Sequence, residues 1–490
     1  MSLVVGVDMA TAGVRALAAD ERGRIVGEAR ADLPEPSRPR PGWSEQDASA
    51  WWPAVAGVLQ ELTGGLGADE RGSIVAVSVC GTSGTVVALD AAGNPVGPAL
   101  MYDDQRAEEE AEEAQEAGAE RWQALGLQVR ATFGLPKWAW LLRHSGRQGG
   151  GQAAGIARLA HAPDLVVARL LDRDAPVDWS HALKSGYDPL RNEWASEALA
   201  ALAIAETLLP EVLPPAEGVG EVGRAAAEAT GLPEGCEVRL GMTDACASQL
   251  AAGAGAPGQW VSVLGSTLVL KGASRDLIVD PEGAVYSHRH PEGWWLPGGA
   301  SNTGARSLVE GFPDADLAEF DEKAADHGPA GGVVYPLLGQ GERFPFAAAD
   351  AEGFTLGELE DEVERYRATL EGVAFVERLG YERLRELGAA VEGPISVTGG
   401  GSGSAVWNRI RATVLGMPVV AKPGASTAAG ACILAAAGSV HGDVTTACRE
   451  MAVDGDQVDP AEDEREALEA SYRRFVDAVD ERGWMDTPGH

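Results

Sequence analysis

Short apolar runs separated by tight turns open the chain. Patterns typical of buried strands cover Leu3–Asp8, Val14–Ala19 and Ile25–Ala31. Because a tight turn separates the first two runs, they predict an antiparallel meander. The elements expected next are a helix at Ala48–Leu62, strands at Ile74–Val79 and Val86–Asp90, helices at Glu108–Leu125, Lys137–Leu142 and Asp164–Leu171, and a mobile loop over 148–154.

The strand–turn–strand pattern returns near the middle of the chain. Gln259–Leu264 and Leu268–Gly272 flank a second turn, and a threonine follows the first strand of each copy, Thr11 and Thr267. The placement of one copy in each half favours an internal duplication over chance. The second half then continues with a helix at Leu359–Leu379, a strand at Ile395–Thr398, a Gly-rich turn at Gly399–Gly403, and helices at Ala405–Leu415, Ser426–Ala437 and Asp463–Arg482.

The length of the chain also favours two domains. A chain of 490 residues is longer than one ordinary hydrophobic core supports. A boundary near residue 250, just before the second copy of the pattern, gives domains 1–249 and 250–490.

Composition narrows the classes of partner. The 39 basic and 74 acidic side chains give a formal net charge of −35, which repels nucleic acid and anionic lipid. A nucleotide site here must therefore supply a local positive field of its own. The five cysteines form no C-x-x-C pair, and no run of about 18 apolar residues is present. These features predict a cytoplasmic protein with neither nucleic-acid nor membrane partners, and they leave a homodimer open.

The first hairpin carries the first chemical signal. Asp8 leaves a buried strand and small residues follow it, so backbone N–H groups and the Thr11 hydroxyl can face an anion. The Asp8 carboxylate can meanwhile hold Mg²⁺ through water. An ordinary Asp-containing turn would show the same pattern. The residues resemble the phosphate-binding hairpin of the actin-like ATPase superfamily and, more closely, that of the FGGY carbohydrate kinases, which usually have Gly-Thr where this chain has Ala10-Thr11.

Further segments that resemble the FGGY family follow in order. Gly81–Asp90 is similar to the sugar-contacting loop, with Thr82-Ser83-Gly84-Thr85 where many xylulokinases have Gln-Met-His-Gly. This hydroxyl-rich version resembles ribulokinase-like members. Met101–Ala107 looks like the W-x-D-x-R segment, whose Asp104 and Arg106 either bind sugar or pair with each other. Asp178–Ala182 resembles the T-D-x-S-N-A stretch, with His181 in place of Asn, and we interpret this histidine as structural.

Gly241–Ala247 resembles the family's G-x-x-D motif, in which the aspartate opens a helix and accepts the proton of the substrate hydroxyl. Phosphoryl transfer needs positioning, charge stabilisation and one base, and the resemblance gives that last role to Asp244. A helix N-cap is the alternative role for this carboxylate. The position of Asp244 just before the second hairpin favours the base.

Two segments of the second half complete the resemblance. Leu264–Leu268 looks like the second phosphate hairpin, and Thr398–Ser404 looks like the adenosine-binding turn. Three consecutive glycines in that turn let the backbone approach a nucleotide without Cβ clashes. Gly298–Gly304 and Gly339–Pro345 match further family segments without an assignable role. Gly253–Gly258 satisfies G-x-G-x-x-G, but it follows a helix and precedes a strand, the reverse of the dinucleotide-binding order.

The resemblance implies two actin/RNase H-like α/β domains, each a mixed five-stranded sheet flanked by helices, which close over MgATP and a small sugar. The implied reaction is ATP-dependent phosphorylation of a terminal hydroxyl, with a ketopentose such as D-ribulose or D-xylulose as substrate and ribulose preferred. The implied site residues are Asp244 as base; Thr82, Ser83, Gly84, Asp104 and Arg106 for sugar; Asp8, Thr11, Gly13, Arg15, Gly265, Ser266, Thr267, Gly399, Gly400, Gly401 and Asn408 for ATP; and Asp8 for Mg²⁺.

Three alternatives remain at this point. The chain could phosphorylate another ketose or polyol, act as an actin-like nucleotide-binding clamp, or be a sugar-binding regulator with a decayed site. A clamp has no use for sugar-contacting segments. The presence of Asp8, Thr11 and Asp244 argues against decay.

Overall fold

The computed structural model describes residues 2–144 and 155–485 of the chain, so the loop predicted over 148–154 lies outside the described residues. The described part forms two compact units, each built around one mixed β-sheet. The first unit consists of Met1–Ala251, His288–Gly293 and Ser426–Ala452, and the second of Ala252–Ser287, Trp294–Ala425 and Val453–His490. No helix among the described residues is long and apolar enough to cross a membrane.

The first unit is organised around a six-stranded sheet in the order β13-β14-β5-β1-β2-β3. The strands β1, β2 and β3 form the predicted antiparallel meander, while β5 lies between β1 and β14 and pairs parallel with both. The central strands are almost continuously apolar because helices bury both faces of the sheet. The strand bounds are β1 (Leu3–Ala10), β2 (Gly13–Asp20), β3 (Ile25–Asp32), β5 (Ile74–Gly81), β13 (Gly218–Glu221) and β14 (Glu237–Thr243).

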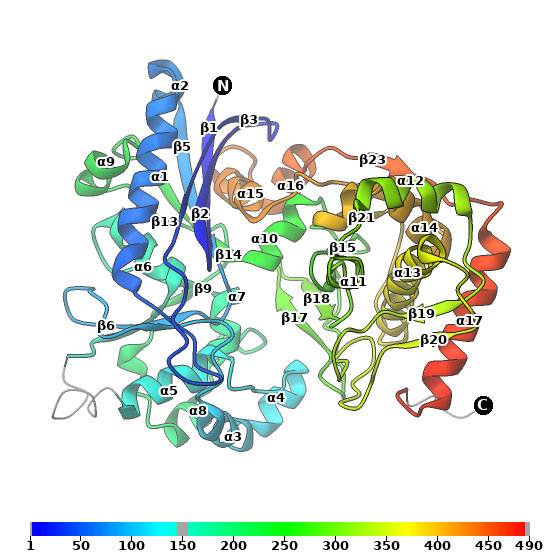
Figure 1. The fold of residues 1–490 in the computed structure, drawn as a ribbon. Helices are drawn as coiled ribbons and strands as arrows, with labels where there is room; N and C mark the ends of the chain where they lie inside the picture. Colours follow the sequence, from blue (N-terminus) through cyan, green and yellow to red (C-terminus); the bar gives the residue numbers. More distant parts are fainter. Residues whose placement is uncertain (1, 145–154, 486–490) are drawn as a thin grey trace. The chain divides into compact units, whose positions relative to one another are not determined.

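Helices α1 (Trp51–Gly65) and α6 (Ala162–Leu171) cover one face of this sheet, and α15 (Thr427–Ser439) covers the other (Figure 1). Helix α15 packs closely against β1 because the strand has a glycine, Gly6, at the contact. A Cβ added at Gly6 of β1 would lie 2.2 Å from the carbonyl oxygen of Ala428. The segment 426–452 therefore packs in the first unit, although in the sequence it lies between two strands of the second sheet, at 419–421 and 456–458.

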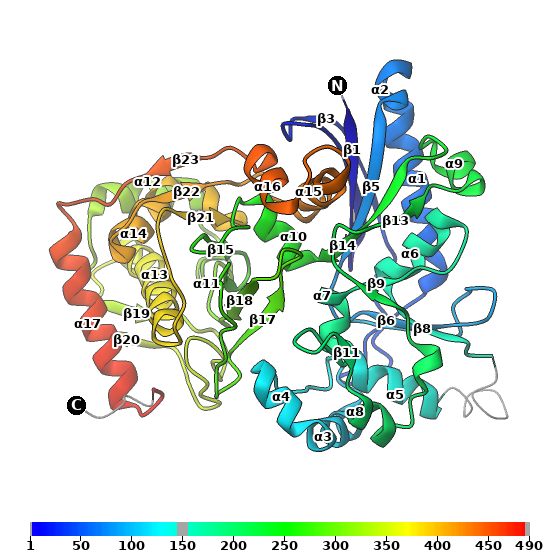
Figure 2. The same cartoon turned by 180° about the vertical axis from the view of Figure 1, so that it is seen from behind.

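The second unit repeats the strand order of the first. Its sheet runs β23-β22-β21-β15-β16-β18-β17, and β21 lies between β15 and β22, parallel to both, as β5 does between β1 and β14 (Figure 2). The duplication predicted from the two hairpins therefore appears in the sheet pairings. Each sheet is mixed, as predicted, but edge strands bring it above five strands. The bounds are β15 (Trp260–Leu264), β16 (Leu268–Gly272), β17 (Val285–Arg289), β18 (Trp295–Ala300), β21 (Ile395–Thr398), β22 (Val419–Ala421) and β23 (Asp456–Val458).

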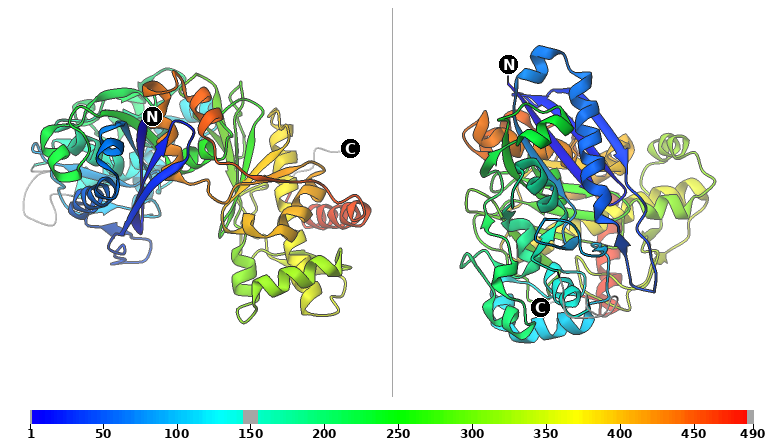
Figure 3. Two further views of the ribbon diagram at one scale, coloured as in Figure 1. Left: turned by 90° about the horizontal axis from the view of Figure 1, so that it is seen from above. Right: turned by 90° about the vertical axis from the view of Figure 1, so that its left-hand side faces the viewer.

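The core of the second unit lies around the long helix α13 (Glu362–Glu386), which packs against α14 (Ala405–Leu415) and α17 (Arg465–Glu481). The last of these is the red helix in Figure 3. The remaining helices are α2 (Ala68–Gly72), α5 (Gly134–His144), α7 (Trp179–Ala182), α8 (Ser196–Ala201), α9 (Arg224–Thr230), α10 (Asp244–Ala251), α11 (Arg306–Gly311), α12 (Leu317–His327) and α16 (Val444–Met451).

The single helix predicted at Glu108–Leu125 is wrong in one respect, because it is two helices, α3 (Glu108–Ala117) and α4 (Ala119–Leu125). The break falls at Gly118, whose backbone leaves the helical range at φ −105° and ψ 18°. A Cβ at this position would lie 2.5 Å from the indole ring of Trp122, so glycine lets that ring pack over the break. The short strands are β4 (Glu45–Gln46), β6 (Val86–Leu89), β7 (Ala99–Leu100), β8 (Arg158–His161), β9 (Val177–Asp178), β10 (Tyr187–Asp188), β11 (Glu193–Trp194), β12 (Val212–Leu213), β19 (Val333–Tyr335) and β20 (Phe354–Leu356).

The close packing of α15 on β1 gives a test of the first unit. We expect Gly6→Ala to lower the free energy of unfolding by about 1–3 kcal/mol or more, because the added methyl meets backbone atoms that cannot rotate away. The matched control is Gly57→Ala in α1, where a Cβ meets nothing within 4 Å and alanine should stabilise the helix by up to about 1 kcal/mol. Urea denaturation measures both. Equal stability of the two variants would contradict the docking of α15 on the sheet.

Candidate functional site

Parallel pairing gathers three polar segments at one edge of the first sheet. Asp8 lies near the end of β1, the loop Thr82–Thr85 follows β5, and Asp244 follows β14. The register places Asp8 opposite Cys80, and Gly81 opposite both Met9 and Thr243. Ligands of α/β proteins characteristically bind at the carboxyl ends of parallel strands. The first unit therefore has one candidate site that contains both predicted carboxylates.

Asp8 has the environment of a cation ligand. Its carboxylate is half-buried, and its Oδ1 atom has no hydrogen-bond partner among the described residues. Burial and the neighbouring charge of Asp244 raise the pKa of Asp8 to about 7, although Arg15 opposes the shift. A divalent cation would relieve this repulsion between two carboxylates. Mg²⁺ needs only one or two protein carboxylates when water and phosphate supply its other ligands, so the residues fit that ion.

The other hairpin residues have structural partners. The Nε atom of Arg15 donates to Glu28 at 2.9 Å on the exposed side of the meander. A Cβ at Gly13 would lie 2.7 Å from the carbonyl oxygen of Ala31, so strand packing alone accounts for this glycine. Thr11 lies at the turn, and its carbonyl oxygen accepts from the Gln46 side chain at 3.0 Å. Contact of these three residues with ATP stays a prediction.

Asp244 begins α10, as predicted. Its Oδ1 atom accepts from the backbone N–H of Ala245 at 2.7 Å, and its side chain is half-buried. The backbone oxygen of Asp244 accepts from the hydroxyl of Ser248 at 2.9 Å and from that of Thr427 in α15 at 3.4 Å. These contacts fix the helix start, and the carboxylate contacts an N–H of the first turn as a helix-starting acid does. The catalytic role of Asp244 stays a prediction.

A buried cluster of Asp178, Ser180 and His181 lies behind the loop and the base. Asp178 caps α7 and accepts from the hydroxyl of Ser180 and from Nδ1 of His181, both at 2.5 Å. Ser180 Oγ in turn accepts from the backbone N–H of Thr243 at 3.0 Å, next to Asp244. Nε2 of His181 lies 3.1 Å from the carbonyl oxygen of Gly81, where the loop begins. The cluster thus connects the segments that carry the loop and the base.

Because its ring is charged, His181 can donate to both Asp178 and the carbonyl oxygen of Gly81. Burial alone would lower the pKa of His181, but the Asp178 carboxylate outweighs burial and raises it to about 9. The ring is therefore an imidazolium at neutral pH, and both of its nitrogens donate. The structural interpretation of His181 agrees with this geometry. Sequence reasoning missed that Asp178 and Ser180 belong to the same cluster, and the only signal for them was the resemblance of this stretch to T-D-x-S-N-A.

The loop Thr82–Thr85 carries two buried hydroxyls and is held in place by a buried lysine. Gly84 adopts φ +83°, and the buried ammonium of Lys137 donates to its carbonyl oxygen at 3.0 Å and to that of Met101 at 2.6 Å. The buried hydroxyls of Ser83 and Thr85 have no hydrogen-bond partner in the part of the chain that the structure describes. Buried polar groups in folded proteins nearly always have one, so these hydroxyls suit a hydrogen-bonding ligand. Lys137, which sequence reasoning missed, holds the loop; burial lowers its pKa to about 7.

A small cavity connects this loop to the first hairpin. It is lined by Thr11, Thr82 and Thr85, together with Gln46 of β4 and Trp51, the first residue of α1. The first unit therefore places part of the predicted phosphate hairpin beside the predicted sugar loop.

Asp104 and Arg106 form an ion pair with each other. Asp104 is fully buried, and its Oδ2 lies 2.7 Å from Nη2 of Arg106. The guanidinium also pairs with Glu45 at 2.7 Å and stacks 3.7 Å from the ring centroid of Trp43. Only 1% of the Arg106 side chain is exposed. This geometry favours the structural alternative for both residues, and their contact with sugar stays a prediction.

The second unit brings its own predicted residues together. The turn at Gly399–Gly401 lies on Leu264, the last residue of β15, and the hairpin Gly265–Thr267 follows directly. A Cβ at Gly399 would lie 2.6 Å from the carbonyl oxygen of Leu264, and Gly399 adopts φ +86°. Asn408 does not point to solvent, because its Nδ2 atom donates to the carbonyl oxygen of Ser402 at 2.8 Å and so holds the turn. Adenosine binding by this turn stays a prediction.

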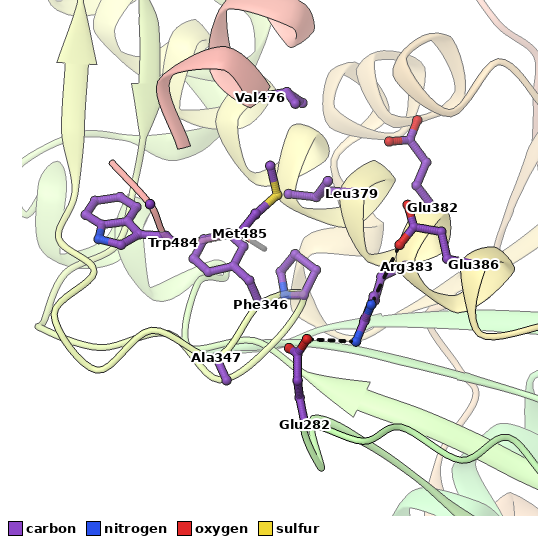
Figure 4. Close-up of a pocket in the computed structure, with 12 residues that line it drawn as sticks. Glu282, Phe346, Ala347, Leu379, Glu382, Arg383, Glu386, Val476, Trp484 and Met485 are labelled. Carbon is purple, nitrogen blue, oxygen red and sulfur yellow. Dashed lines mark hydrogen bonds and ion pairs between the residues drawn. The ribbon is translucent and has the colours of Figure 1, made fainter. Parts of the chain in front are cut away.

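A separate pocket of about 380 Å³ lies in the second unit beside α13 and the end of α17 (Figure 4). Arg383 forms ion pairs there with Glu282 at 3.1 Å and Glu386 at 3.8 Å. Phe346 and Trp484 add apolar surface. Because the guanidinium is already paired with carboxylates, nothing in this pocket favours phosphate binding, and the pocket contains none of the predicted site residues.

Comparisons with known proteins identify the family to which the chain is similar. The N-terminal domain model of the FGGY family of carbohydrate kinases matches residues 3–251, and the C-terminal domain model matches residues 261–439. A xylulose kinase from Klebsiella pneumoniae is 27% identical over 425 residues, which cover 85% of each chain. A glycerol kinase from Gloeobacter violaceus is 28% identical over 438 residues, covering 85% of this chain and 84% of the other.

Solved structures resemble the whole chain. The crystal structure of xylulose kinase from Rhodospirillum rubrum has a TM-score of 0.86 and 28% sequence identity, and the match covers 98% of both chains. The predicted α/β class, with two sheet-containing domains, is therefore confirmed.

The ion pair of Asp104 and Arg106 gives a second test. We expect Arg106→Met to lower the free energy of unfolding by about 3–5 kcal/mol, because Asp104 is left charged and buried. Adding Asp104→Asn should recover part of this loss, which urea denaturation of the single and double variants measures as a coupling energy. If Arg106 instead serves only to bind sugar, Arg106→Met will keep full stability and raise the KM for sugar alone.

Proposed function

Because the chain belongs to the FGGY family of carbohydrate kinases, it is an ATP-dependent sugar kinase, and we propose that it phosphorylates a terminal hydroxyl of a ketopentose with Asp244 as general base. The observation that carries this assignment is the meeting of Asp8, the hydroxyl-rich loop Thr82–Thr85 and Asp244 at the ends of three parallel strands. The sparse cysteines continue to predict a cytoplasmic location, and a homodimer stays a prediction.

In the proposed reaction each unit has a separate set of tasks. The first unit supplies the sugar loop, the base and the hairpin with Asp8 and Thr11. The second supplies the hairpin Gly265–Thr267 and the turn Gly399–Gly401, whose N–H groups can donate to phosphate oxygens. Mg²⁺ held by Asp8 would offset the phosphate charge. The Asp244 carboxylate takes the proton of the terminal hydroxyl as that oxygen attacks the γ-phosphorus and ADP leaves.

The hydroxyls of the loop support a neutral, polyhydroxy substrate. Ser83 and Thr85 can both donate to and accept from sugar hydroxyls, and neither carries charge. The relatives named above are described as kinases of xylulose and of glycerol, which differ in size. We propose a ketopentose over glycerol because the loop offers several hydroxyls, and D-ribulose over D-xylulose because the loop resembles that of ribulokinase-like members.

A coupled assay of ADP release with a panel of sugars tests this substrate class. We expect D-ribulose or D-xylulose to raise ADP production well above the rates with glycerol and with no sugar, and EDTA to abolish that production until Mg²⁺ is restored. Glycerol as the best substrate would overturn the ketopentose assignment. Slow hydrolysis that no sugar stimulates would support a nucleotide-binding clamp instead.

Asp244→Asn tests the base. We expect kcat to fall by about 10²–10⁴-fold, the usual contribution of general-base catalysis, while the affinity for ATP stays near that of the unchanged protein. The control is Asp326→Asn, an exposed carboxylate on α12. Rapid-quench turnover and calorimetric ATP binding separate the two effects. Near-normal turnover of Asp244→Asn would remove this residue from the role.

A further inference from the structure

Two segments that the sequence left without a role meet at one side chain, Glu342. Gly298–Gly304 and Gly339–Pro345 are about forty residues apart in the chain, but both lie in the second unit and contact each other. Glu342 belongs to the second segment and is 4% exposed. Its carboxylate contacts the first segment at three consecutive residues, 301–303.

Five neutral donors surround the Glu342 carboxylate. Oε2 accepts from the hydroxyls of Ser301 at 2.8 Å, Tyr335 at 3.0 Å and Thr303 at 3.2 Å. Oε1 accepts from the backbone N–H groups of Asn302 at 2.6 Å and Arg343 at 2.9 Å. A buried carboxylate satisfied by this many hydrogen bonds fixes each donor strongly, because bonds to a charged acceptor are about twice as strong as neutral ones. Glu342 therefore holds the segment 301–303 in one conformation.

The held segment is also the support of the second phosphate hairpin. The N–H of Leu268 donates to the carbonyl oxygen of Thr303 at 2.8 Å, and the N–H of Ala305 donates to that of Gly265 at 2.9 Å. A Cβ at Gly304 would lie 2.5 Å from Cα of Thr267, so only glycine permits this contact. The backbone of the segment thus lies directly against the backbone of the hairpin turn.

The turn itself has the exposure that a binding site requires. Ser266 is exposed and Thr267 half-buried, while the segment beneath them is buried at Ser301 and Thr303. A flexible turn would have to be ordered when phosphate binds, and that ordering costs conformational entropy. A turn already held from below avoids much of this cost.

We infer that Glu342 is a positioning residue for nucleotide phosphates: it acts through Ser301–Gly304 to hold the hairpin Gly265–Thr267 in its binding conformation. This inference rests on the proposed function of that hairpin. Among the described residues, Glu342 has no hydrogen bond to the turn Gly399–Gly401, which we propose binds adenosine, so its effect is directed at the phosphate end of the nucleotide. The competing explanation is that Glu342 only stabilises the packing of the second unit. In that case its replacement should weaken the binding of ATP and of adenosine to the same extent.

Glu342→Gln separates these explanations. Gln keeps the size of the side chain but replaces one acceptor oxygen with a donor, so at least one of the five hydrogen bonds to the carboxylate is lost. We expect the Kd for ATP to rise about tenfold or more, with the Kd for adenosine and the KM for sugar unchanged within twofold. Calorimetric titration with ATP and with adenosine measures the first two, and the coupled ADP assay measures the third.

The matched control is Glu371→Gln in α13. This carboxylate is also buried in the second unit, but its partners are Arg367 at 2.7 Å and the N–H of Ala330 at 3.1 Å, away from the hairpin. The Glu371→Gln variant should therefore be less stable, but the ratio of its affinity for ATP to its affinity for adenosine should not change. If Glu342→Gln does not fold, Ser301→Ala removes one donor to the carboxylate and should raise the Kd for ATP selectively as well.

Each outcome decides between defined alternatives. If the unchanged protein does not bind ATP, the proposed function fails before the inference is tested. If the unchanged protein does bind ATP, the variant Glu342→Gln (or Ser301→Ala in its place) decides the question. The positioning role is overturned if this variant lowers the affinities for ATP and adenosine equally, or lowers neither. A selective loss of ATP affinity, absent in Glu371→Gln, supports it.

Discussion

The parallel pairing of β5 with β1 on one side and β14 on the other is the constraint on which the candidate site depends. Parallel strands end at the same edge of a sheet, so residues 8, 82 and 244 become neighbours although more than 230 residues separate the first from the last. A different strand order would separate the two carboxylates. Burial and, after it, repulsion from Asp244 raise the pKa of Asp8, and that repulsion is a direct result of this pairing.

The same arrangement explains how a strongly acidic chain can bind an anion. Its net charge of −35 repels ATP at long range, so attraction must come from groups within the site. In the proposed site, neutral donors take the place of a basic surface: they are backbone N–H groups of turns that buried side chains hold in place. The carboxylates of Glu342 and Asp178 are acidic themselves, but each is satisfied locally by its own donors.

The two hairpins and the duplication could be predicted from the sequence, because their strands are continuous apolar runs and their turns carry small residues and threonine. The edge strand β13 could not, since Gly218–Glu221 has no apolar run and forms only by pairing with β14. The break at Gly118 could not be predicted either, because one glycine destabilises a helix by only about 1 kcal/mol. The break also depends on the ring of Trp122, which packs over Gly118 in the fold.

The supporting residues of the site escaped prediction for a related reason. Ser180 holds a backbone group 63 positions away, and His181 one that is 100 positions away. Glu342 contacts a segment about forty residues earlier in the chain. No local pattern encodes such pairings. Asp104 and Arg106 show that a local pattern can also suggest a role that the fold makes unnecessary. Their motif resembles a sugar-binding segment, but in the structure the two side chains form a buried ion pair with each other.

The most direct test of the central claim is a crystal structure of the protein with a ketopentose and an ATP analogue bound. The account predicts hydrogen bonds from sugar hydroxyls to Ser83 and Thr85, and a terminal hydroxyl within about 2.6–3.2 Å of the Asp244 carboxylate. A sugar bound away from the ends of β1, β5 and β14, or a carboxylate of Asp244 directed away from the bound sugar, would contradict it.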